Sequence, residues 1–244
     1  MDSKELLDSD ELRGRIWRGQ SARSRELALP TGFAALDRYL PGGGWPLGSL
    51  IEVFVERHGV GELTLLLPAL ATLTGSEQLR TTVARKWVAW IAPPFVPYAP
   101  ALQQRGVRVD ALLLVHPSNK ECLWTVEQVI RSGSSSGVLA WLAAADHVAL
   151  RRLQLAAEEQ GCWTILFRPF SARHERSPAA LRIGLDQEGA TTRVRIDKCR
   201  GAWPGVVDIT ESLRGSELGS SDGAYSAPEA GRESAEDSGG GATG

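Results

Sequence analysis

Short apolar runs alternate along the chain with stretches in which apolar residues recur every three or four positions. The run 50–55 predicts a buried strand, and 120–131 places Cys122, Val126 and Ile130 at helical spacing. Strands that alternate with helices indicate βαβ crossovers, so we predict an α/β fold with a mostly parallel sheet flanked by helices. The predicted strands are 50–55, 87–92, 111–115, 137–142 and 163–167, and the predicted helices are 62–74, 98–104, 120–131 and 146–160.

The two ends of the chain depart from this alternation. Residues 3–18 place apolar side chains among charges, which predicts a helical arm that docks on the body. Strands at 181–185 and 192–197, joined by a short Gly-containing link, predict a hairpin at the sheet edge. Residues 211–244 hold eight Gly and seven Ser, so this tail is predicted to be disordered. The chain therefore divides into an arm with its linker (1–26), one domain (27–210) and a tail (211–244).

Composition narrows the functional classes. The tail has seven acids and two arginines, a charge of −5, which leaves +3 on residues 1–210 of a chain with net charge −2. Such a mildly basic body favours anionic partners only weakly. Three widely spaced cysteines without a C-x-x-C pair predict a reducing compartment and neither disulfides nor a zinc site. With no secretion signal and no apolar run long enough to span a membrane, we expect a cytoplasmic protein.

The residues after the strand 50–55 have the setting of a phosphate-binding loop, with a strand, a glycine-bearing loop and an apolar helix. The pattern of such loops is G-x-x-x-x-G-K-[ST]. If Gly61 takes the place of the second glycine, Glu62 stands at the lysine and Leu63 at the magnesium-holding hydroxyl residue. A glutamate repels phosphate, since two unit charges about 4 Å apart interact by roughly 4 kcal/mol at an effective dielectric near 20. We predict a degenerate loop, with Gly59, Gly61, Glu62 and Leu63, that binds no nucleotide cofactor.

The segment 29–55, LPTGFAALDRYLPGGGWPLGSLIEVFV, resembles the opening of the RecA-type ATPase core. It has T-G-x-x-x-L-D, a Gly-Gly-x-P-x-G turn and an I-x-E strand in the same order. Together with GVGELTLLLPAL, it is most similar to the ImuA family, over residues 12–210. The resemblance implies a RecA-like core and a role in the SOS response, beside a translesion polymerase relative. The implied partners are RecA, ImuB and an error-prone replicative-type polymerase.

The residues that support ATP hydrolysis in RecA-type cores are also missing. By the resemblance, the second core strand should end in a glutamate and the fourth in an aspartate that holds the magnesium shell. Here these strands end in Ala92-Pro93 and Trp141-Leu142. We therefore predict a binding protein and not an enzyme, with no catalytic residue and no cofactor. Four histidines lack metal-ligand spacing, so no metal site is predicted: His58, His116, His147 and His174.

Three residues are candidates for contacts with partners. Trp45, flanked by Gly and Pro, is expected to be exposed near the ligand edge, where packing under a turn is favoured over stacking on nucleic acid. Direct DNA contact therefore has weak support. Lys198 and Arg200 belong to a strand ending that is similar to the K-x-R-x-G ending of hexameric helicases and RadA. This resemblance implies that both side chains extend toward the γ-phosphate bound by a neighbouring subunit. A plain basic strand end is the alternative. Other tryptophans on predicted strands are assigned to the core: Trp87, Trp90, Trp141 and Trp163.

Two other functions match parts of the sequence. WVAWIAPP at 87–94 is also similar to SulA, a cell-division inhibitor that binds FtsZ, but SulA lacks the TGFAALD and GGGWP segments. An ATP-dependent RecA-type recombinase with an unusual loop is the second alternative. The resemblance to the ImuA family, together with the missing ATPase residues, implies a non-catalytic RecA-like accessory factor of SOS-induced translesion synthesis.

Overall fold

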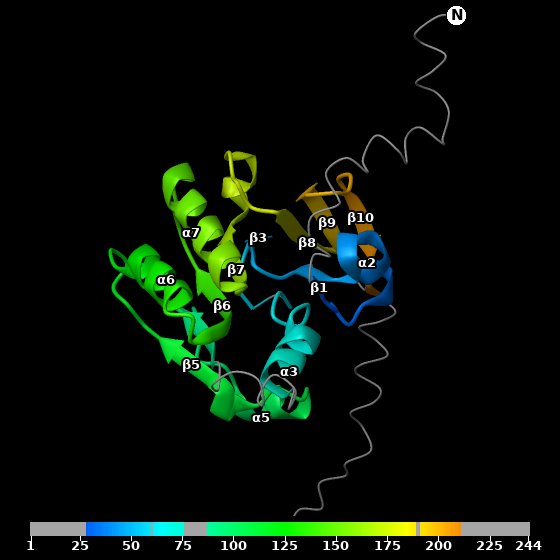
Figure 1. Ribbon diagram of the computed structural model, residues 1–244. Helices are drawn as coiled ribbons and strands as arrows, with labels where there is room; N and C mark the ends of the chain where they lie inside the picture. The colour runs from blue at the N-terminus through cyan, green and yellow to red at the C-terminus, as the bar shows by residue number, and fades with distance from the viewer. Residues whose placement is uncertain (1–27, 60, 76–86, 189–190, 211–244) are drawn as a thin grey trace, which may run out of the picture.

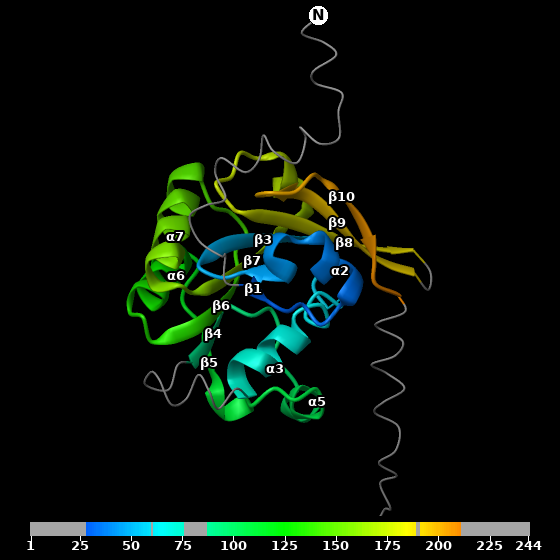
Figure 2. The same ribbon diagram turned by 45° about the vertical axis from the view of Figure 1, so that its right-hand side comes forward.

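A sheet of eight strands organises the computed structural model, which describes residues 28–59, 61–75, 87–188 and 191–210 (Figures 1 and 2). The strand order is β10-β9-β8-β3-β7-β6-β4-β5. The strands are β3 (Ser49–Val55), β4 (Trp87–Ile91), β5 (Leu112–Val115), β6 (Ser135–Trp141), β7 (Trp163–Pro169), β8 (Leu181–Glu188), β9 (Thr191–Cys199) and β10 (Gly205–Asp208). The helices are α2 (Ala34–Tyr39), α3 (Leu67–Gly75), α5 (Ala99–Gln104), α6 (Cys122–Arg131) and α7 (His147–Gln160). The predicted arm and tail lie outside the described residues.

The centre of the sheet is parallel, as the alternation of strands and helices predicts. β3 pairs in parallel with β7 and β8, β6 with β7, and β4 with β5 and β6. The predicted hairpin is the antiparallel pair β8–β9. It does not form the edge of the sheet, because the unpredicted strand β10 pairs antiparallel with β9 and covers it. With only four residues, β10 carries too little alternation to be predicted from its sequence.

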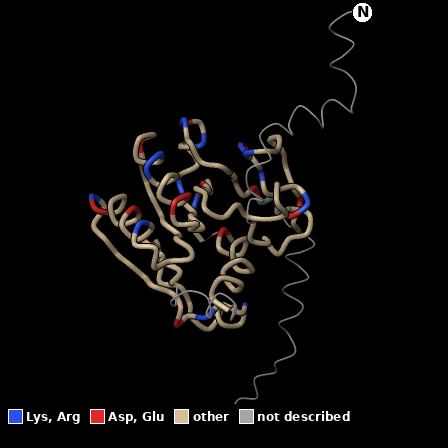
Figure 3. Tube along the Cα trace, viewed as in Figure 1, with Lys and Arg blue, Asp and Glu red and all other residues tan. Residues whose placement is uncertain are grey.

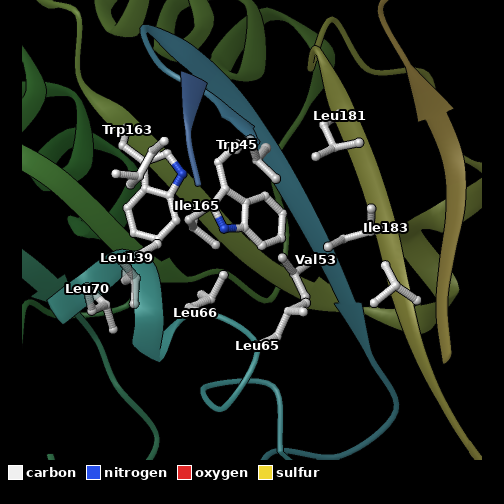
Figure 4. Packing of buried hydrophobic residues seen from close by; sticks show 14 of the residues in the cluster. Trp45, Val53, Leu65, Leu66, Leu70, Leu139, Trp163, Ile165, Leu181 and Ile183 are labelled. Atoms are coloured by element: carbon white, nitrogen blue, oxygen red, sulfur yellow. The ribbon is translucent and has the colours of Figure 1, made fainter. Parts of the chain in front are cut away.

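The larger of two apolar cores lies on the face of the sheet that α2, α3 and α5 cover. These helices contribute Leu36, Leu70 and Leu102 to it. Figure 4 shows its centre, where Trp45 and Trp163 lie among strand residues and the leucines that lead into α3. A two-stranded ribbon of β1 (Ala28–Leu29) and β2 (Trp45–Pro46) brings Trp45 into this core.

The opposite face of the sheet packs against α6 and α7 (Figure 1). Cys122, Val126 and Ile130 of α6 face this second core at the four-residue spacing that predicted the helix. The ends of α7 also match the sequence. The side chain of Asp146 accepts the N–H of Ala149 at 2.7 Å, and Gly161 ends the helix with a φ of 63°.

The helix after the glycine loop starts later than predicted. We expect 62–74, but α3 begins at Leu67. Residues 61–66 form tight turns, closed by bonds from Thr64 N to Gly61 O and from Leu66 N to Leu63 O. Pro68 consequently falls in the first helical turn, where its missing N–H breaks no helical bond.

One of the four strand tryptophans is also placed differently. Trp90, Trp141 and Trp163 are buried as predicted, but Trp87 is 36% exposed. It is the first residue of β4, at the end of the strand, and the residues before it lie outside the described ranges. A residue at the end of a strand has fewer neighbours than one in the middle of the sheet, which leaves part of Trp87 exposed.

Charged residues of both signs are interspersed over the outer helices and loops (Figure 3). Within the described residues, no large region of the trace in this view carries a single sign. Within the described ranges, none of the helices combines the length and the apolar composition needed to cross a bilayer.

Candidate functional site

The loop after β3 closes on itself through Glu62. Gly59 and Gly61 have φ angles of 83° and 98°, which glycine adopts at little cost. The backbone N–H of Gly59 donates to Glu62 Oε1 at 2.8 Å, and Glu62 is only 3% exposed. In a phosphate-binding loop, backbone N–H groups of this kind donate to a bound phosphate. Here the carboxylate of the loop's own glutamate accepts one of them.

The residues after Glu62 also differ from a loop that holds a phosphate. Leu63 stands where a magnesium-holding hydroxyl is expected, and its side chain packs against the core. The helix N-terminus that donates to phosphate in such loops lies farther along the chain, because α3 starts at Leu67. The side chains of both Glu62 and Leu63 are therefore turned toward the protein.

The strand ends beside the loop carry apolar groups where catalytic acids are expected. β4 runs into Ala92 and then Phe95, whose ring atom Cε2 lies 3.7 Å from a Cβ built on Gly59. After β6, the first acid is Asp146, and its side chain caps α7. In the described part of the chain, no group of three or more His, Cys, Asp or Glu could hold a metal ion.

A buried ion cluster beside the loop was missed by the sequence analysis. Glu52 in β3 is fully buried and accepts bonds from Arg168 Nη1 at 2.8 Å and from Arg182 Nε at 2.7 Å. Arg168 also donates through Nη2 to Glu175 Oε2 at 2.8 Å. The signal in the sequence was a glutamate inside an otherwise apolar strand, since a buried carboxylate requires partners.

The carboxylates of the cluster favour the charged form of Arg168. Burial alone would lower the pKa of Arg168, but the carboxylates of Glu52 and Glu175 hold that pKa above its ordinary value. Backbone carbonyls take further N–H groups, with Arg168 donating to Ala145 and Arg182 to Ala172. These bonds connect β3, β7 and β8 to the segment after β7, which includes the short helix η5 (Phe170–His174). The first role of the cluster is therefore to stabilise the fold.

Lys198 and Arg200 lie together at the end of β9, but their side chains differ in hydrogen bonding and in exposure to solvent. Lys198 Nζ donates to the carbonyl of Ser177 at 2.9 Å. Burial lowers the pKa of Lys198, and the positive charges of Arg182 and Arg200 lower it further, while Glu52 acts in the opposite direction. The side chain of Arg200 is 52% exposed, with Nη1 3.7 Å from Glu158 Oε1. Arg200 is thus the more accessible of the two.

The expectation that Trp45 is exposed is wrong. Trp45 has no exposed surface, and its ring centroid lies 6.3 Å from that of Trp163. The Gly and Pro residues around Trp45 build the turn that folds it inward. Packing under a turn, the alternative that the sequence favoured, is what the structure has, and a surface platform for bases at Trp45 is excluded.

Comparisons with known proteins connect this geometry to a family. No family model matches the chain. Protein ImuA of Caulobacter vibrioides strain NA1000 is 29% identical over an alignment of 201 residues, and the match covers 72% of this chain and 80% of that protein. These findings support an assignment to the ImuA family. The resemblance to the ImuA family that the sequence indicates is thereby confirmed.

RecA proteins are similar to a smaller part of this ImuA-like chain. RecA 1 of Myxococcus xanthus is 31% identical over 118 residues, 48% of this chain and 32% of that protein. RecA of Streptomyces ambofaciens is 33% identical over 125 residues, 50% of this chain and 31% of that protein. With the parallel sheet and its flanking helices, these matches confirm the RecA-like fold class. The chain spans about a third of these RecA proteins, so their activity is not carried over to it.

A solved structure of SulA from Pseudomonas aeruginosa is also similar, at 25% identity and a TM-score of 0.40. The match covers 49% of this chain and 97% of SulA.

Proposed function

We propose that this chain is a non-catalytic RecA-like accessory factor of SOS-induced translesion DNA synthesis. Its work would be to bind RecA, the complex of ImuB with an error-prone polymerase, or both. The similarity to ImuA supports the general role. The choice between a binding protein and an ATPase depends on the loop after β3.

The bond between Glu62 and Gly59 is the observation that carries the proposal. A nucleotide phosphate would have to displace the carboxylate from the Gly59 N–H and then remain beside its negative charge. That repulsion is roughly 4 kcal/mol for charges about 4 Å apart at an effective dielectric near 20. No lysine at this position offsets it, and the neighbouring strand ends carry Ala92 and Trp141 in place of acids.

A RecA-like chain of this kind could act by taking the place of a subunit. Folds that assemble head to tail present two different surfaces, and a member with an empty nucleotide site can still contribute one of them. Lys198 and Arg200 at the end of β9 would then approach a nucleotide held by the partner's loop. Arg200 is the better placed, because Lys198 already donates to Ser177.

Two measurements test the proposal. Calorimetry with ATP and Mg²⁺ should give no binding at micromolar concentrations, with RecA as the positive control. Purified chain should be captured by ATP-bound RecA filaments or by ImuB from the same genome, and not by FtsZ. Micromolar ATP affinity would restore the recombinase alternative, and capture by FtsZ alone would establish the SulA-like alternative.

A further inference from the structure

β4, α5 and the loop between them contain no charged residue, although 23% of the residues of the chain are charged. From Trp87 to Gln104 there is no Asp, Glu, Lys or Arg. Between β4 and α5, three apolar or aromatic side chains are nevertheless open to solvent, with Phe95 65%, Val96 81% and Tyr98 73% exposed. We call residues 92–98 the Phe95 loop. Exposed apolar side chains that gather in one loop, with no charge among them, are typical of an interaction site.

The backbone of the Phe95 loop is held in place. Ala92 has a φ of 52°, the one positive φ outside glycine among the described residues. Its N–H donates to the carbonyl of Val115 at 2.8 Å, which fixes this turn to the end of β5. Prolines follow at positions 93, 94, 97 and 100, and each restricts the chain further. A strained residue held by its surroundings is a reason to look for function, and a rigid loop loses little entropy when it binds.

The loop lies where α/β proteins bind their ligands, at the carboxyl ends of parallel strands. The ring of Phe95 approaches Gly59, in the loop that Glu62 closes. An aromatic, uncharged surface therefore stands at the position expected for a nucleotide and its catalytic acid. The replacement changes the chemistry of the site from phosphate recognition to apolar contact.

We infer that the Phe95 loop inserts Phe95, Val96 and Tyr98 into an apolar pocket on a protein partner. This inference rests on the proposed function and specifies the surface that serves it. Nucleic acid is a poor match, because binding to a strand requires cations along the backbone as well as aromatic rings. The lack of charge in residues 87–104 matches an uncharged pocket instead.

A second copy of this chain offers no suitable receptor in the hollow beside Cys199. That hollow is lined by Leu40, Pro41, Pro46, Cys199 and Arg200 among others, and its volume is about 10 Å³. Such a volume holds about one water molecule, not a phenylalanine ring. This hollow of a second copy therefore cannot receive the loop, and the inference commits to a heterologous protein partner.

The experiment compares the full-length chain with variants of the Phe95 loop. Phe95→Ser with Tyr98→Ser removes both rings, and Val96→Asp places a charge in the contact. Trp124→Ser in α6 is the matched control, since Trp124 is also a large exposed side chain (62%) but lies outside the Phe95 loop. Dissociation constants are measured separately for ATP-bound RecA filaments and for ImuB. For whichever of these proteins the wild-type chain binds, both loop variants should raise the dissociation constant about tenfold or more. The dissociation constant of the control variant should stay within about twofold of the wild-type value.

Each result decides a different point. If the wild-type chain binds neither protein, the proposed function fails and the inference falls with it. If the wild type binds but both loop variants bind equally well, only the inference is overturned. A loss of single-stranded DNA binding, or a change from dimer to monomer in light scattering, would assign the loop to nucleic acid or to a second copy and also overturn it. Unchanged melting temperatures show that the exposed substitutions leave the fold intact.

Discussion

Glu52 and Glu62 are both buried glutamates, one in β3 and one in the loop that follows it, yet their surroundings differ. Glu52 lies inside β3 and faces two guanidinium groups, those of Arg168 and Arg182. Glu62 lies in the loop that follows and accepts the backbone N–H of Gly59. The first arrangement connects several strands, and the second affects a single turn. Burial of a carboxylate therefore indicates either stability of the fold or closure of a site, depending on what it contacts.

The largest expected effect follows from removing the charge of Glu52. Glu52→Gln leaves Arg168 and Arg182 buried without their shared counter-ion, which should lower the free energy of unfolding by about 3–5 kcal/mol. Urea denaturation followed by circular dichroism measures this value. Asp110→Asn is the control, because its bridge to Arg108 is largely exposed and should contribute less than about 1 kcal/mol. A cost for Glu52→Gln as small as the control's would show that the cluster is not structural.

Glu62→Gln should cost much less, about 1 kcal/mol, because an amide oxygen can still accept the Gly59 N–H. Removing this charge should also fail to create ATP binding. The double change Glu62→Lys with Leu63→Thr should not give hydrolysis, since the acids of the neighbouring strands remain absent. Phosphate release assays on each variant decide this, and measurable turnover would mean that the loop retains catalytic capacity.

A smaller effect is expected at the end of β9. If the chain takes the place of a RecA-type subunit, Lys198→Ala with Arg200→Ala should weaken binding to ATP-bound RecA by about 1–2 kcal/mol. Arg200→Ala alone should give most of the loss, because Lys198 is held by Ser177. Arg151→Ala with Arg152→Ala controls for loss of charge on α7. Equal weakening by the two pairs, or binding that ignores the partner's nucleotide, would leave Lys198 and Arg200 as a plain basic strand end.

The smallest effect is expected from deleting residues 211–244. A tail rich in Gly and Ser buries little surface, so the melting temperature should stay nearly constant. Differential scanning calorimetry of the full and shortened chains measures it. A fall of more than about 5 °C, on the order of 1 kcal/mol for a small domain, would show that the tail docks on the body.

Much of the fold could be predicted from the sequence because the signals are local. Apolar runs predicted the central strands, helical spacing predicted α6, and the predicted range 146–160 agrees with α7, which Asp146 and Gly161 cap. The start of α3 could not be predicted in the same way, since the apolar run from Leu63 to Leu66 suits a helix but forms turns. Trp45 shows the same limit, because its burial depends on the distant Trp163.

The sequence by itself determined that lysine and acids are absent from the positions that the resemblance to RecA-type cores assigns to nucleotide binding and catalysis, since that requires only the identity of residues such as Glu62. The tertiary structure alone decided what those positions do instead. It turns Glu62 toward Gly59, brings Phe95 beside the same glycine and places Glu52 between arginines distant in sequence. The physical reason is that hydrogen bonds, ion pairs and burial depend on distances between segments, and these distances exist only after the chain has folded.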